Sequence, residues 1–124
     1  MKSFIFTIIL MLFFTSTSFA TEKDILKAFE KIKAATEVGV NYLDYNDLLT
    51  NVKVEINLFE REEGHNKVFS EKANKCYTKY DLASFMWQLN NKSKSWGVSD
   101  TSESEIPNAW LNGSKCIDEL YQIK

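Results

Sequence analysis

The strongest pattern of hydrophobic and polar positions in the chain is an apolar stripe that recurs every three or four residues between Phe69 and Trp87. At about 100° per residue in an α-helix, its members fall within roughly 40° of one line. They are Phe69, Ala73, Cys76, Tyr80, Ala83 and Trp87. This spacing predicts a central helix from about Asn66 to about Asn90, around which the rest of the domain is organised.

The second half of this helix is apolar on its opposite side as well, at Leu82, Phe85, Met86 and Leu89. A helix with two apolar sides is either covered on both or offers one of them to a partner. We expect a second layer of helices to bury these four side chains. The alternative is an exposed docking face, which makes the four residues candidate binding residues.

A basic strip of Lys72, Lys75 and Lys79 runs beside the central stripe. Glu71 is placed to pair with Lys75 across one helical turn. We expect an ordinary solvated flank here, and the alternative is a site for an acidic partner.

Two amphipathic helices are predicted before the central one. The first begins near Thr21, where Thr21 and Asp24 form a weak capping box, and it stops at Gly39. The second begins with Asp44 as its cap. The apolar positions are Ile25, Phe29 and Ile32 in the first helix, and Tyr45, Leu48, Leu49, Val52, Ile56 and Phe59 in the second.

A last helix is predicted to start with Ser104 as its cap and Pro107 in its first turn. Its apolar stripe consists of Ile106, Trp110, Gly113, Ile117 and Leu120, with Cys116 and Tyr121 at the edges. Because Gly113 costs about 1 kcal/mol in helix propensity relative to alanine, we expect it to permit a close approach to the neighbouring helix. The fold class predicted from these patterns is a small all-α bundle of about four amphipathic helices.

Residues 91–103 form the only long irregular stretch in the predicted domain. Loops of about 13 residues are uncommon in small domains and are usually mobile or functional. Trp96 stands in this loop, and tryptophan contributes strongly to binding at interfaces. We expect Trp96 to fold back as a plug over the core, and the alternative is a binding anchor.

The first twenty residues have the pattern of a cleaved signal peptide. An apolar run follows Lys2, and Ser18 and Ala20 occupy the −3 and −1 positions of a cleavage site. The alternative is a retained membrane anchor, but the apolar segment of roughly 16 residues is shorter than a membrane-spanning helix, which needs about 20. We therefore expect a signal peptide over 1–20 and a single helical domain over 21–124, located in the periplasm or secreted.

The charge balance argues against two classes of partner. The full chain has a formal net charge of −2. Removal of the signal peptide leaves 14 basic and 17 acidic residues and therefore a net charge of −3. Nucleic acids and anionic membrane surfaces both call for a basic excess. We therefore expect no nucleic-acid partner and no stable membrane insertion after signal cleavage.

Cys76 and Cys116 are the two cysteines of the chain. In an exported protein such a pair indicates a disulfide, and a bridge closing about 40 residues stabilises a fold by roughly 4 kcal/mol in the chain-entropy model. The alternative, a redox-active or metal-binding pair, lacks both a C-x-x-C spacing and supporting histidines.

The segment AATEVGVNYLDY (residues 34–45), followed by an amphipathic helix, resembles a segment of small exported bacterial proteins of uncharacterised function. The spacing of Tyr80 and Trp87 and the position of Trp110 are similar to that group as well. The resemblance covers about a quarter of the chain. It implies an all-helical exported domain, and it carries over no activity and no functional residue.

The sequence offers little for catalysis. With one histidine, His65, and both cysteines paired, the usual nucleophile–base pairs are excluded, and there is no phosphate-binding glycine loop. His65 beside Glu60, Glu62 and Glu63 is a weak metal signal, because nothing fixes the ligand geometry. We expect no enzyme, no cofactor and no metal site.

Two functions remain as hypotheses. The favoured one is an exported module that binds another protein through Trp96 and the face formed by Leu82, Phe85, Met86 and Leu89. The alternative is a carrier of a small apolar ligand between the helices, supported by the many aromatic residues, although such richness is more often found in a core.

Overall fold

The computed structural model describes residues 20–95 and 102–123, with side chains described for 20–92 and 105–123. These residues contain no strand and form four helices, which are α2 (Glu22–Val38), α3 (Tyr42–Glu60), α4 (Lys67–Ser95) and α5 (Ser102–Tyr121). The predicted small all-α bundle is confirmed.

Two predictions lie outside the described residues. The signal peptide predicted over residues 1–20 is one, since only its last residue, Ala20, is described, and Trp96 is the other. Among the helices that are described, none combines the length and the apolar character that crossing a bilayer requires.

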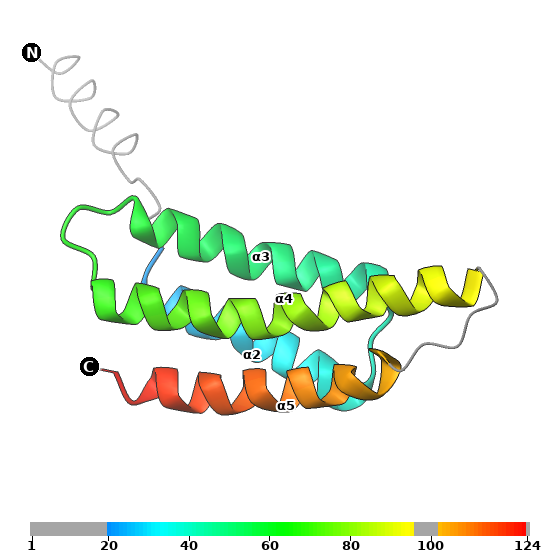
Figure 1. The fold of residues 1–124 in the computed structure, drawn as a ribbon. Coiled ribbons are helices and arrows are strands. Elements are labelled where there is room, and N and C mark those ends of the chain that lie inside the picture. Colours follow the sequence, from blue (N-terminus) through cyan, green and yellow to red (C-terminus); the bar gives the residue numbers. More distant parts are fainter. Residues whose placement is uncertain (1–19, 96–101, 124) are drawn as a thin grey trace, which may run out of the picture.

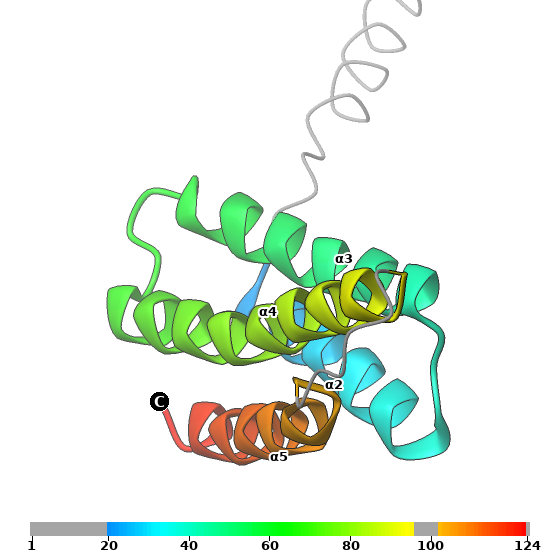
Figure 2. The same cartoon turned by 45° about the vertical axis from the view of Figure 1, so that its right-hand side comes forward.

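Helix α4 is the central element of the bundle. Figures 1 and 2 show α3 along one side of α4 and α5 along the other, with α2 behind them, and successive helices run in opposite directions. Helix α4 packs against both α3 and α5, whereas α2 packs mainly against α3 and less extensively against α5. The predicted stripe of α4 accordingly faces the interior: Phe69, Ala73, Cys76, Tyr80 and Ala83 are buried and Trp87 is partly buried.

Helix α2 begins and ends as its local sequence predicts. The Thr21 side chain accepts a hydrogen bond from the Asp24 amide at 3.3 Å, and the Asp24 carboxylate accepts one from the Thr21 amide at 2.8 Å, which completes a capping box. The hydrogen bond from the Thr21 amide lowers the pKa of the Asp24 carboxyl. The helix ends at Gly39, whose φ of +113° is a conformation that favours glycine.

The predicted start of the second helix is wrong by three residues. The cap of α3 is Asn41, whose side-chain oxygen accepts a hydrogen bond from the Asp44 amide at 2.8 Å. Asparagine and aspartate are about equally good caps, so local preference does not separate the two positions. The earlier start places Tyr42 in the first turn, where its ring contacts Trp87 of α4 at 5.5 Å between centroids.

The irregular segment predicted over residues 91–103 is shorter than expected at both ends. Helix α4 continues to Ser95 and α5 already begins at Ser102, so Ser104 is a helical residue and not the cap. Pro107, predicted in the first turn, is the sixth residue of α5. The residues that extend α4 have helix propensities within about 0.7 kcal/mol of alanine, so extending a helix that is already packed is inexpensive.

The contact between α4 and α5 is close because Gly113 has no side chain. A Cβ atom at this position would lie 2.6 Å from Cε2 of Tyr80. Three residues further along α5, Cys116 forms the predicted disulfide with Cys76, with 5.4 Å between the Cα atoms and both residues buried. The predicted close approach and the disulfide are both confirmed.

Aromatic side chains from all four helices meet in the core. The Tyr45 hydroxyl donates a hydrogen bond to the Tyr80 carbonyl at 2.6 Å, and burial raises the pKa of both tyrosines. The ring of Tyr45 also contacts Trp87 and Trp110, each at 5.9 Å, and the ring of Tyr80 contacts Phe29 at 6.3 Å. The Tyr80 hydroxyl itself is buried and has no hydrogen-bond partner among the described residues.

Candidate functional site

The candidate binding residues of α4 are mostly exposed, contrary to the expectation of a second covering layer. The exposed fraction is 46% for Leu82, 56% for Phe85 and 39% for Leu89, whereas Met86 is partly buried against the core. The reason is geometric. Helices α3 and α5 contact the two flanks of α4 and α2 lies behind it, so the described helices leave its outer side uncovered.

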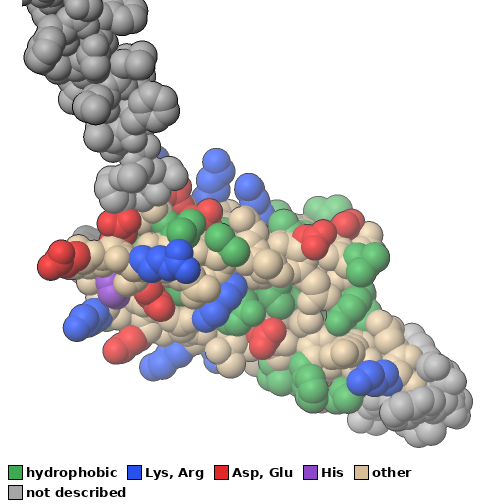
Figure 3. All heavy atoms as spheres, turned by 90° about the horizontal axis from the view of Figure 1, so that it is seen from above, with side chains coloured by type: hydrophobic (Ala, Val, Ile, Leu, Met, Phe, Trp, Pro, Cys, Tyr) green, Lys and Arg blue, Asp and Glu red, His purple; other side chains and the backbone are tan. Residues whose placement is uncertain are grey.

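The three exposed side chains form one continuous strip on α4. Leu82, Phe85 and Leu89 are three and four residues apart, so at about 100° per residue they fall within roughly 60° of arc. Figure 3 shows hydrophobic side chains exposed on the half of the molecule toward the C-terminal end of α4. We call Leu82, Phe85 and Leu89 the apolar strip.

A hollow of about 460 Å³, open to solvent, lies between α4 and α5 over the disulfide. Its lining includes Lys72, Lys75 and Lys79 of α4 and Lys115 of α5, together with Cys116. The predicted basic strip is therefore one wall of a groove and not an isolated flank. We call this hollow the lysine groove.

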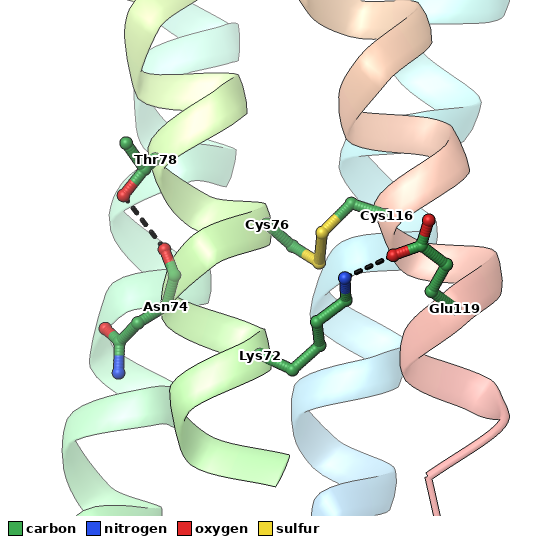
Figure 4. The surroundings of a disulfide bond; sticks show 6 residues. All are labelled: Lys72, Asn74, Cys76, Thr78, Cys116 and Glu119. Atoms are coloured by element: carbon green, nitrogen blue, oxygen red, sulfur yellow. Dashed lines mark hydrogen bonds and ion pairs between the residues drawn. A yellow bond between two sulfur atoms is a disulfide. The ribbon is translucent and has the colours of Figure 1, made fainter. Parts of the chain in front are cut away.

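One carboxylate, that of Glu119, lies within the lining of the lysine groove. It forms an ion pair with Lys72, and this hydrogen bond lowers the pKa of the Glu119 carboxyl. Figure 4 shows the Lys72 side chain extending across to Glu119 beside the disulfide. The predicted pair between Glu71 and Lys75 is wrong, because no ion pair joins these two described residues, and Lys75 lines the groove.

The opposite flank of α4 is closed by a polar network with α3. The Glu60 carboxylate accepts hydrogen bonds from the Ser70 hydroxyl at 2.8 Å and from the Asn74 side-chain amide at 2.6 Å. The Asn74 side-chain oxygen accepts a third from Lys53 at 3.1 Å, and the Lys53 ammonium lies 5.1 Å from the Tyr77 ring centre. The hydrogen bonds from Ser70 and Asn74 lower the pKa of Glu60. These groups are occupied in joining α3 to α4.

The His65 ring contacts residues that are close to it in the sequence. The Nδ1 atom of His65 lies 2.8 Å from the Glu62 carbonyl oxygen, and the ring packs edge-on against Phe59 at 5.5 Å. Among the described residues, no three histidine, cysteine, aspartate or glutamate side chains are grouped so that they could hold a metal ion.

Lys115 is the site residue that sequence reasoning missed. It lies on the last helix, 36 residues away from Lys79, and no periodicity links it to the basic strip. The predicted disulfide could have revealed it, because Lys75 and Lys115 each directly precede a cysteine of the bonded pair and must therefore lie near one another.

Comparisons with known proteins identified no relative of this chain. No protein-family model matches the chain, and neither a curated protein nor a solved structure matches it.

Proposed function

We propose that this protein is an exported protein-interaction module that binds a partner protein through the apolar strip on α4. The observation that carries the proposal is the exposure of Leu82, Phe85 and Leu89 at adjacent helical positions. Single exposed apolar residues are ordinary, but a contiguous group is typical of interaction surfaces. Burying a leucine or phenylalanine side chain is worth about 1.5–3 kcal/mol, so a partner that covers this strip gains substantially.

Export is supported by the N-terminal pattern and by the disulfide. Disulfides persist in oxidising compartments, such as the periplasm and the extracellular space. The Cys76–Cys116 bridge is buried and holds α5 on α4, because its two cysteines belong to these two helices. The periplasmic or secreted location and the absence of enzymatic activity stay predictions.

The alternative of a carrier for a small apolar ligand receives no support from the aromatic residues that suggested it. These side chains contact one another in the core, where the Phe59 and Phe69 rings lie 5.7 Å apart and the Trp87 and Trp110 rings 6.1 Å apart. We therefore propose the interaction module alone.

The test is site-specific photo-cross-linking in cells that make the protein, followed by reconstitution. A photoreactive phenylalanine analogue replaces Phe85, and the same analogue at Val54, which is exposed on α3, serves as the control position. A partner that cross-links only from position 85 is identified by mass spectrometry, purified and titrated with the protein.

The reconstituted binding then separates the apolar strip from the rest of the surface. We expect Leu82→Ser to weaken binding about tenfold, since about 1.4 kcal/mol corresponds to a factor of ten in affinity. Val54→Ser is the matched control, because both side chains have an exposed fraction of 46%. Equal affinities for the two variants, or identical cross-links from both positions, would refute the proposed function.

A further inference from the structure

The lysine groove and the apolar strip continue one another along α4. Lys75 and Lys79 of the groove and the three residues of the apolar strip, Leu82, Phe85 and Leu89, fall within roughly 120° of arc on one helix. At about 1.5 Å per residue, the line from Lys75 to Leu89 is about 21 Å long. One side of α4 is therefore basic in its first half and apolar in its second half.

The charge of the groove is opposite to that of the whole chain. Its lining contains four lysines and one glutamate, whereas the chain has a formal net charge of −2. Lys75, Lys79 and Lys115 form no ion pair with any described residue. The lining therefore has an excess of positive charge even with Glu119 included, so the groove is electrostatically complementary to a partner that carries several carboxylates.

We propose that the lysine groove binds the acidic part of an amphipathic helix of the partner protein, while the apolar part of that helix covers the apolar strip. This inference rests on the proposed function and specifies the chemistry of the partner. Lys75 and Lys79 are one helical turn apart, a separation of about 6 Å that matches carboxylates four residues apart on the partner helix. An amphipathic helix laid along a groove is a common recognition mode.

Phosphate-bearing ligands fit the groove less well. Two-pronged recognition of a phosphate uses arginine, and the cationic side chains that line the groove are all lysines. The adjacent apolar strip also has no counterpart on a nucleic-acid backbone. Thr78, which lines the groove, donates its hydroxyl hydrogen bond to the Asn74 carbonyl at 2.9 Å and so does not present it to a ligand (Figure 4).

The experiment uses fluorescein-labelled synthetic peptides and the purified, disulfide-bonded protein. An 18-residue Ala/Gln helix carries glutamates four residues apart in one half and leucines at alternating spacings of three and four in the other. This ordered peptide is made in both chain directions, and a scrambled peptide of the same composition is the control. Fluorescence anisotropy gives the dissociation constants at low and at high salt.

Two triple variants separate the groove from net charge. Lys75→Gln, Lys79→Gln and Lys115→Gln remove three charges from the groove. The matched control Lys23→Gln, Lys27→Gln and Lys31→Gln removes three charges from exposed positions of α2. Because each exposed ion pair contributes only modestly to affinity, we expect the loss of all three to weaken binding of the ordered peptide about tenfold. The control variant should bind that peptide as the wild type does.

The expected salt response follows from screening. The Debye length falls to about 8 Å at physiological ionic strength, so affinity for the ordered peptide decreases with salt in the wild type and much less in the groove variant. Equal affinities for the two triple variants would overturn the inference, and so would tighter binding of a 20-nucleotide single-stranded DNA than of the ordered peptide. Failure of both peptide directions to bind the wild type in a saturable manner overturns it as well.

Failure of this inference is distinguishable from failure of the proposed function. If the partner cross-linked from position 85 responds to Leu82→Ser but not to the groove variant, the interaction module stands and the acidic-helix partner is wrong. If Leu82→Ser has no effect on that partner, the proposed function itself is wrong.

Discussion

Replacing Gly113 by alanine tests the packing of α5 on α4 through the sign of the stability change. Inside a helix, alanine is favoured over glycine by about 1 kcal/mol, so helix propensity alone predicts that the variant is more stable. The structure predicts the opposite, because the new methyl group would lie 2.6, 2.8 and 2.9 Å from three ring atoms of Tyr80.

The magnitude follows from how little the surroundings can yield. Tyr80 is fully buried and its ring contacts Phe29, and the disulfide three residues from Gly113 ties α5 to α4. Overpacking a well-packed core costs about 1–3 kcal/mol, and three contacts this short point to the upper end of that range. After the gain in propensity is subtracted, we expect Gly113→Ala to lower the free energy of unfolding by about 2 kcal/mol. For a domain of this size, that corresponds to a fall of about 8–16 °C in Tm.

The assay is urea denaturation of the disulfide-bonded protein, in which circular dichroism at 222 nm monitors the loss of helix. Asn108→Ala, at an exposed position of the same helix, is the control for propensity and should be neutral or slightly stabilising. In a Tyr80→Leu background the ring atoms are gone, so the same glycine substitution should cost at least 1 kcal/mol less. Stabilisation by Gly113→Ala in the wild-type background would refute the close-approach reasoning.

Two further predictions concern polar groups of the core and of the α3–α4 flank. Tyr45→Phe and Tyr80→Phe make the same chemical change but should differ in effect. We expect Tyr45→Phe to lower the free energy of unfolding by about 1 kcal/mol, because it removes the hydrogen bond to the Tyr80 carbonyl. We expect Tyr80→Phe to be neutral or stabilising, because the buried Tyr80 hydroxyl has no hydrogen-bond partner among the described residues. Glu60→Gln should lower stability by a few tenths of a kcal/mol at neutral pH. Since the pKa of Glu60 is lowered in the folded state, its contribution is present above the ordinary glutamate value of 4.5 and is lost as the pH falls below it, so the two proteins should converge in acid.

Both predictions are checked by urea denaturation, with Glu63→Gln, in the turn that follows α3, as the control for the loss of a negative charge. Equal effects of the two tyrosine variants would contradict the assignment of the hydrogen bond to Tyr45. A stability difference between wild type and Glu60→Gln that stays constant from pH 7 to pH 3 would contradict the role of the Glu60 carboxylate.

The fold was predictable from the sequence because each helix carries its own periodic signal. The stripe from Phe69 to Trp87 and the capping box at Thr21 are local patterns, and local patterns are sufficient to place a helix and its start. The disulfide was predictable for a similarly simple reason, since two cysteines allow one pairing. The ends of α3, α4 and α5 were less accurate. Asn41 and Asp44 are comparable caps, and the contact of Tyr42 with Trp87, which the earlier start makes possible, is not visible in the local sequence.

The candidate site was predictable only in part. The sequence identified two apolar sides on α4 and a basic strip, but periodicity does not reveal which side neighbouring helices will cover. The lysine groove needed a second wall, and Lys115 reaches it through a contact between residues far apart in the chain.

The sequence by itself determined that this chain forms amphipathic helices joined by one disulfide, because spacing, caps and cysteine number are properties of the chain alone. Only the tertiary structure decided that Leu82, Phe85 and Leu89 are exposed and that Lys115 joins the other lysines. The physical reason is that exposure and charge clustering depend on which helix faces pack together, and that choice is made by the fit of whole faces, such as Gly113 against Tyr80, across long distances in the sequence.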